Sequence, residues 1–132
     1  MKHSGQLAAA AMSCQRAIEI DPNNAMAYFN LGNTYQDLKM YDLAINSFQE
    51  VLQRDSSHVD AQFNLAVSFQ DRANGAATLK EKIDDLQCAC KCYEEVHINR
   101  PDIIEAKKAF ESLTKVLQGL SSSSSSSSQP AL

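Results

Sequence analysis

Three closely spaced cysteines are the residues in this chain with the clearest potential for chemistry. Cys88, Cys90 and Cys92 alternate along one stretch, and His97 follows five residues later. Thiolate and imidazole groups are common zinc ligands, but zinc requires four of them in a tetrahedral arrangement. Alternate positions on a single helix do not provide that geometry. We therefore interpret the cysteines as small packing residues, and we expect no metal and no cofactor.

The cysteine pattern also bears on the compartment. Residues two and four apart on one helix cannot form an unstrained disulfide, and Cys14 lies far upstream. Reduced thiols are typical of the cytosol, so we expect a cytoplasmic protein.

Nothing else in the sequence is typical of an enzyme. There is no glycine-rich phosphate-binding loop and no nucleophile with an evident base, and His3, His58 and His97 fall at a terminus, a helix start and a helix end. We expect no catalytic residue and no enzymatic activity. With 12 Lys and Arg against 16 Asp and Glu, the net charge of −4 argues against nucleic-acid binding. No apolar run is long enough for a membrane span.

The elements that position these residues follow from an internal repeat. The segment 27–31, Ala-Tyr-Phe-Asn-Leu, returns 34 residues later as Ala-Gln-Phe-Asn-Leu at 61–65. A period of this length is typical of a solenoid of helical hairpins that bury their apolar faces on one another. Apolar residues at helical spacing predict helices over about 6–20, 25–38, 41–54 and 58–72, a longer fifth helix ending near 97, and a sixth over about 103–120. The predicted helix caps are Asn24, Ser57 with Asp60, Thr78 with Glu81, and Asp102 with Glu105.

These residues resemble the tetratricopeptide repeat (TPR). The first unit supplies Tyr28, Leu31, Gly32, Tyr35, Ala44 and Phe48; the second supplies Leu65, Ala66, Phe69, Ala89, Tyr93, Val96 and Pro101; and Ala10, Cys14, Ala17 and Pro22 match the second helix of a unit whose first helix is missing. Val51 and Ser56 depart from the usual Ala and Pro. The resemblance implies an all-α solenoid over residues 1–120, with a half repeat, two full repeats and a C-terminal capping helix. The serine run that opens the tail, 121–132, has no apolar residues with which to form a core, and we expect the tail to be disordered.

The second unit carries an insertion. Ala89 would fall at 78 if the period held, so 89 − 78 = 11 residues have been added. Eleven residues make close to three helical turns, so longer helices could absorb them without changing the buried face. We predict an extended hairpin, with a loose loop over 73–82 as the alternative.

The resemblance implies that a partner peptide or helix lies in the concave groove formed by the first helices of the units. Asn30 and Asn64 occupy the same position one period apart, and their amides could bind the backbone of an extended peptide. Peptide-binding superhelices of the family, including the O-linked N-acetylglucosamine transferase, use asparagines in this way. The alternative is that they bond to neighbouring helices. Phe29 and Phe63 could form an apolar shelf for a partner side chain, or pack against each other. The expected groove residues are Phe29, Asn30, Asn33, Gln36, Phe63, Asn64, Gln70 and Asp71.

Other partners and assembly states follow from the same resemblance. One TPR subclass holds a chaperone's acidic C-terminal peptide with lysines and an arginine on the first helices. Asn33 matches an asparagine of that clamp, but Phe29 stands where a lysine belongs, and only Lys107 and Lys108 are cations placed remotely well. We therefore do not expect this partner. The competing hypothesis is a structural subunit that forms a homo-oligomer through the exposed N-terminal half repeat and the elongated hairpin. The start midway through a unit also suggests a fragment or splice form of a longer repeat protein.

Overall fold

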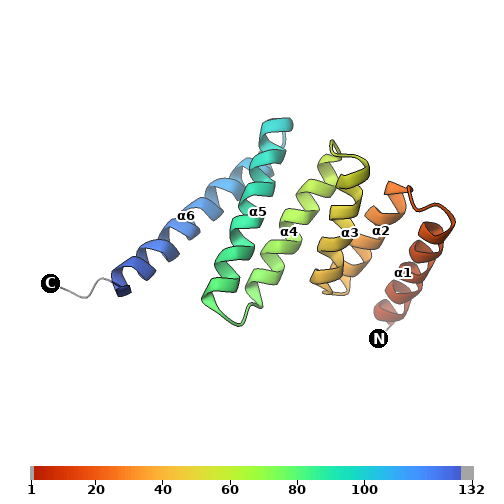
Figure 1. Cartoon of the computed structure of the whole chain (residues 1–132), viewed down its shortest axis with the longest axis horizontal. Helices are drawn as coiled ribbons and strands as arrows, with labels where there is room; N and C mark the ends of the chain where they lie inside the picture. The colour runs from red at the N-terminus through yellow and green to blue at the C-terminus, as the bar shows by residue number, and fades with distance from the viewer. Residues whose placement is uncertain (1, 129–132) are drawn as a thin grey trace.

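The computed structural model describes the fold of residues 2–128 and the side chains of residues 5–120. Within this part of the chain the secondary structure is helical, with six helices joined by short turns. Each helix runs antiparallel to the one before it, and the stack extends from α1 at one end to α6 at the other (Figure 1). The all-α solenoid expected from the sequence is confirmed. The helices are α1 (Lys2–Ile20), α2 (Ala25–Asp37), α3 (Tyr41–Arg54), α4 (Val59–Asn74), α5 (Leu79–Asn99) and α6 (Ile104–Ser128).

Local chemistry explains most helix ends. The Asn24 side chain accepts a hydrogen bond from the backbone N–H of Ala27, which caps α2 as predicted. Lys39 ends the same helix in the left-handed region, with φ of 62°, and lets the N–H of Met40 reach back to the carbonyl of Tyr35 at 2.8 Å. Thr78 caps α5 by accepting from the N–H of Glu81, as the sequence predicts.

Two predicted caps are wrong. The cap of α4 is His58, whose Nδ1 accepts from the N–H of Ala61 at 3.0 Å. Ser57 instead donates its hydroxyl to Asp55, because that carboxylate already organises the preceding turn. At the start of α6, Asp102 accepts two hydrogen bonds from the guanidinium of Arg100 and does not serve as the predicted cap.

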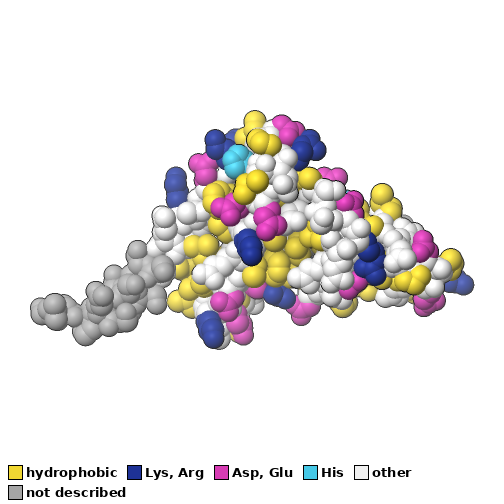
Figure 2. All heavy atoms as spheres, turned by 45° about the horizontal axis from the view of Figure 1, so that its top comes forward, with side chains coloured by type: hydrophobic (Ala, Val, Ile, Leu, Met, Phe, Trp, Pro, Cys, Tyr) yellow, Lys and Arg dark blue, Asp and Glu magenta, His cyan; other side chains and the backbone are white. Residues whose placement is uncertain are grey.

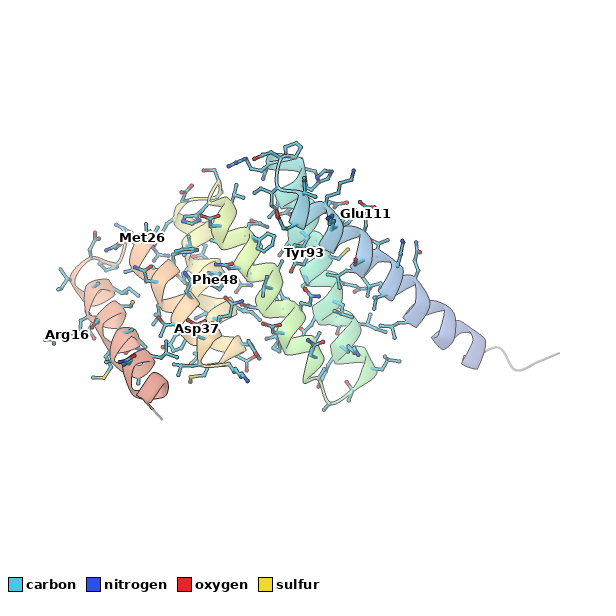
Figure 3. The ribbon with its side chains drawn as sticks, turned by 180° about the vertical axis from the view of Figure 1, so that it is seen from behind. Arg16, Met26, Asp37, Phe48, Tyr93 and Glu111 are labelled. Carbon is cyan, nitrogen blue, oxygen red and sulfur yellow. The ribbon has the colours of Figure 1, made fainter. Side chains whose placement is uncertain are left out.

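The core lies between successive hairpins. Ala44, Phe48 and Val51 of α3 are fully buried, and Ala89 and Val96 take the same places in α5. Figure 3 shows Phe48 and Tyr93 inside the stack, between the ribbons of neighbouring helices. These small residues and rings are the ones that the sequence predicted for close helix packing.

The insertion forms an extended hairpin, as predicted, and not a loose loop. Helix α4 continues to Asn74, the turn is short, and α5 has 21 residues against 14 in α3. The lengthened part is held by Arg72 of α4, whose guanidinium pairs with buried Asp85 of α5 at 2.7 Å and with Asp42 of α3 at 2.9 Å. The first ion pair joins the two helices of the hairpin, and the second connects the hairpin to the preceding unit.

The two ends of the stack differ in what covers them. Ala10 of α1 is exposed, whereas its equivalents Ala44 and Ala89 are 0% exposed. Ser13 of α1 is also exposed, whereas its equivalent Ser47 is buried. The surface on which a preceding first helix would lie is therefore uncovered.

Helix α6 closes the other end of the stack by packing Ala106 and Leu113 against α5. Its described backbone continues through Ser128. Disorder of residues 121–132 stays a prediction: the side chains of this segment are outside the described part, as are residues 129–132 altogether. None of the described helices has both the length and the hydrophobicity needed to cross a bilayer.

Candidate partner-binding groove

Helices α2, α4 and α6 are equivalent first helices. Ala27, Ala61 and Ala106 are buried at the same point near their N-terminal ends. The first pair is one period of 34 apart, and the second pair is 45 apart, which is the period plus the 11 inserted residues. Residues at equal offsets from these alanines therefore occupy equivalent positions on the three helices.

A pocket of about 370 Å³ lies between these three helices. We call it the α2–α4–α6 pocket. The side chains that line it come from the first two turns of the helices and from the turn before α6. They are Phe29, Asp60, Phe63, Asn64, Ile103 and Glu105.

The two phenyl rings expected in the groove both line this pocket, and each also packs on its own hairpin. The Phe29 ring lies 6.0 Å from that of Phe48 and 4.8 Å from the imidazole of His58, between centroids. Phe63 meets Tyr93 edge to face at 5.4 Å. Both rings are half-buried, so each combines a packing role with an accessible face.

The asparagines behave differently from one another. The amide of Asn64 donates to the side-chain oxygen of Asn33 at 2.9 Å, which links α4 to α2. Asn30, at the position equivalent to Asn64, is exposed. The interpretation of Asn64 as a residue bonded to a neighbouring helix therefore describes one of its contacts, and the same residue also lines the pocket.

The other expected groove residues lie further along the helices. Gln70 accepts a hydrogen bond from the hydroxyl of buried Tyr93 at 2.9 Å, so its oxygen is engaged in the packing of α4 on α5. Asp71 lines a separate hollow with Lys39 and Met40, and burial raises the pKa of its carboxyl. Gln36 is half-buried near the C-terminal end of α2. The structure does not bring these three into the α2–α4–α6 pocket.

Three lining residues were missed by the sequence reading: Asp60, Ile103 and Glu105. Asp60 was interpreted as part of a cap, and Glu105 likewise. The offset from the buried alanines identifies two of them, because Asp60 precedes Ala61 as Glu105 precedes Ala106, whereas Ile103 has no such signal. The insertion hides this correspondence in a simple search at the repeat period.

The electrostatics of the pocket are set by carboxylates. Asp60 and Glu105 are both exposed at its edge. In the space-filling view, acidic side chains lie beside hydrophobic ones over the middle of the molecule (Figure 2). The nearby guanidinium of Arg100 is paired with Asp102 at 2.8 Å, and this hydrogen bond is the main cause of the lowered pKa of Asp102.

Cys90 and Cys92 lie in packing surfaces of α5, whereas Cys88 is exposed, so the interpretation as a packing residue is wrong for Cys88. Burial is the main cause that raises the pKa of the Cys92 thiol to about 12, with a further contribution from the charge of Glu95. Cys90 is half-buried, and its sulfur lies 3.5 Å from the hydroxyl of Thr114 on α6. Among the side chains that the structure describes, no group of three or more His, Cys, Asp or Glu is placed to hold a metal ion.

Comparisons with known proteins agree with this architecture. Residues 13–46 match a family model described as tetratricopeptide repeat. Over 62 residues, 47% of the chain, the sequence is 40% identical to the peptidyl-prolyl cis-trans isomerase FKBP4 of Mus musculus, and it is equally similar to that of Rattus norvegicus. The match spans only 14% of the length of these relatives.

Solved structures with the same fold extend over most of the chain. The first TPR domain of Spaghetti (RPAP3), solved with the HSP90 peptide SRMEEVD, superposes with a TM-score of 0.71 at 19% identity, covering 86% of this chain and 82% of that one. The type III secretion translocator chaperone SycD of Yersinia enterocolitica gives 0.57 at 22% identity, covering 92% and 77%. At these identities the likeness concerns the fold. With the internal repeat and the buried alanines and rings, it shows that the chain has the fold of a tetratricopeptide-repeat solenoid.

Proposed function

We propose that this protein is a non-catalytic adaptor that holds a peptide or helix of another protein in the groove between α2, α4 and α6. The observation that carries the proposal is the α2–α4–α6 pocket, in which exposed parts of Phe29 and Phe63 lie beside amide and carboxylate groups. Concave surfaces that combine apolar anchors with a few polar groups are typical of binding sites. The solved complex of the similar RPAP3 domain with a peptide supports a role of this kind.

The expected strength of binding is modest. A short stack offers a groove of three helices, and a pocket of about 370 Å³ accommodates one or two side chains of a partner. We expect a dissociation constant in the micromolar range, roughly −8 kcal/mol. The cytoplasmic location inferred from the cysteines is part of this proposal.

A random peptide library displayed on phage tests the groove. The full chain is used as bait beside two variants with the same substitution, Asn64→Arg in the pocket and Asn46→Arg on the exposed face of α3. The wild type and Asn46→Arg should enrich the same peptides, and Asn64→Arg should lose them because the longer side chain fills the pocket. Circular dichroism establishes that both variants are folded. Unchanged enrichment with folded Asn64→Arg would contradict the groove assignment.

A second function is favoured by the uncovered face of α1. Exposed Ala10 lies where a preceding first helix would pack, because its equivalent Ala44 is fully buried, and apolar surface of this kind is typical of an association site. The chain would then be a structural subunit that associates through α1. Sedimentation equilibrium at several concentrations tests this with Ala10→Lys, and Ala77→Lys at another exposed alanine is the control. A monomer at all concentrations excludes self-association.

A further inference from the structure

The two carboxylates of the α2–α4–α6 pocket occupy equivalent places on successive first helices. Asp60 stands one residue before buried Ala61, and Glu105 one residue before buried Ala106. Residues at equal offsets in a solenoid face the same side of the stack. Both side chains line the same pocket, so their charges act on the same bound group.

The lining of the pocket contains no cation that would neutralise this acidity. None of the six lining residues is Lys or Arg. Arg100 donates two hydrogen bonds to Asp102, and this contact is the main cause of the raised pKa of Arg100. The charge of Asp60 raises the same pKa by a smaller amount. Lys108 is exposed at the position equivalent to Phe63, 45 residues on. The lining itself therefore carries two carboxylates and no cation.

The remaining polar group of the lining, the amide of Asn64, can accept a hydrogen bond from the ligand. The amide nitrogen of Asn64 donates to Asn33, and the carbonyl oxygen of the same amide can accept from a bound group. With Asp60 and Glu105 this provides oxygen acceptors on two helices. Ammonium and guanidinium groups are the side chains that offer several N–H donors and no acceptor.

The apolar part of the pocket favours a ligand that also carries an apolar side chain. Phe29, Phe63 and Ile103 come from three different segments and surround the same space. All three are half-buried, so each retains surface that a partner can cover. An aliphatic or aromatic side chain would displace water from them, which is favourable in proportion to the area covered.

We infer that the pocket selects a basic segment of a partner protein, in which a large apolar side chain adjoins Lys or Arg. This rests on the proposed function and adds the chemistry of the partner. Such a segment has the opposite charge to the acidic peptide SRMEEVD held by the similar RPAP3 domain. An acidic segment would be repelled here, because its carboxylates would face Asp60 and Glu105. Charge complementarity of this kind governs specificity and association rate more than total affinity.

Asp60 and Glu105 also have a structural explanation that needs no ligand. Both lie in the first turn of a helix, where a carboxylate interacts favourably with the helix dipole. That role does not require a position beside three half-buried apolar side chains. A charge change that alters peptide preference without altering the fold separates the two explanations.

The same random-peptide library gives the test when the charge of the selected peptides is examined. The baits are the full chain, Glu105→Lys, and the control Glu111→Lys, which makes the same change at an exposed site of α6 outside the pocket. We expect the wild type and Glu111→Lys to enrich peptides with Lys or Arg beside an apolar residue, and Glu105→Lys to lose that preference. For one such peptide, fluorescence anisotropy should show binding weakened about tenfold by Asp60→Lys with Glu105→Lys and less than about twofold by Glu111→Lys.

The outcomes distinguish this inference from the function on which it rests. Enrichment of acidic or uncharged peptides that Asn64→Arg abolishes would overturn the basic preference and leave the groove in place. Enrichment of nothing by the folded chain would overturn both. If basic peptides bind Glu105→Lys as strongly as they bind the wild type, the carboxylates do not select them. Higher salt should weaken a genuine charge pairing, because counterions screen exposed charges.

Discussion

Gly32 of α2 lies directly against the ring of Phe48 of α3. A methyl group at Gly32 would stand 2.7 Å from Cε1 of that ring, 2.8 Å from Cδ1 and 2.9 Å from Cζ. These separations are shorter than any van der Waals contact, and the ring is fully buried, so it has no space into which to move. The absence of a side chain at residue 32 therefore sets how closely the two helices of the first hairpin approach.

Gly32→Ala should destabilise the protein by about 1–3 kcal/mol through this overpacking, although alanine favours a helix. Gly119→Ala is the matched control, because nothing lies within 4 Å of the position at which its methyl group would stand. That change should be neutral or stabilising by about 0.5–1 kcal/mol. Urea unfolding followed by circular dichroism measures both. If the two substitutions have the same effect, the close contact does not limit the packing.

Sequence alone predicts the stack well because its rules are local or periodic. Pro22 and Asn24 mark a break between helices through backbone chemistry that does not depend on tertiary structure. Small residues at 32 and 44 and the ring at 48 recur at positions where helices approach closely. The insertion was predictable as an extended hairpin because eleven residues preserve the helical phase.

The groove is less predictable, because its members are chosen by contacts between distant segments. The bond from Asn64 to Asn33 and the bond from Tyr93 to Gln70 depend on which side chains face each other across helices. Ile103 lies in a turn and has no repeat signal of its own. His58 caps α4 through a ring nitrogen. The usual preference for Ser or Asp at a helix cap therefore predicted the neighbouring Ser57 instead.

The ion pair between Arg72 and Asp85 should stabilise the extended hairpin. Asp85 is buried, and Arg72→Met would leave its carboxylate without the guanidinium that pairs with it. Since Arg72 is 37% exposed, water can partly replace it, and we expect a loss of about 1–2 kcal/mol. Arg100→Met, which breaks the exposed pair with Asp102, should change thermal stability little. Equal losses in the two variants would show that burial of Asp85 does not matter.

The asparagine pair gives a test of structural coupling between the first helices. Asn64→Ala should cost about 0.5–1.5 kcal/mol, because it leaves Asn33 without its donor. Asn30→Ala, at the equivalent but exposed position, should remain within about 0.5 kcal/mol of the wild type. The double variant of Asn33 and Asn64 should cost less than the sum of the single changes. Strict additivity would mean that the hydrogen bond contributes nothing.

Cys92 makes the stability of the fold dependent on alkaline pH. Its ordinary thiol pKa of 9.0 is raised by burial to about 12, so the folded protein retains a proton that the unfolded chain loses. Between these two values the folded state binds more protons, and the free energy of unfolding must fall as pH rises. Burial also raises the pKa of Tyr93 to about 12 from 10.0, which adds a loss of the same sign above pH 10. Unfolding in urea should therefore become easier from pH 9 to 12.

Cys92→Ala should flatten that dependence between pH 9 and 10, where Tyr93 contributes little. Cys88→Ala is the control, because Cys88 is exposed whereas Cys92 is buried. Removing the Cys88 thiol should leave most of the pH dependence of the unfolding free energy in place. Alkylation followed by mass spectrometry gives an independent measurement, because the thiolate is the reactive form. In the folded protein at pH 9, Cys92 should react much more slowly than in urea. Equal rates in the two states would show that the thiol is accessible and that its burial does not control its ionisation.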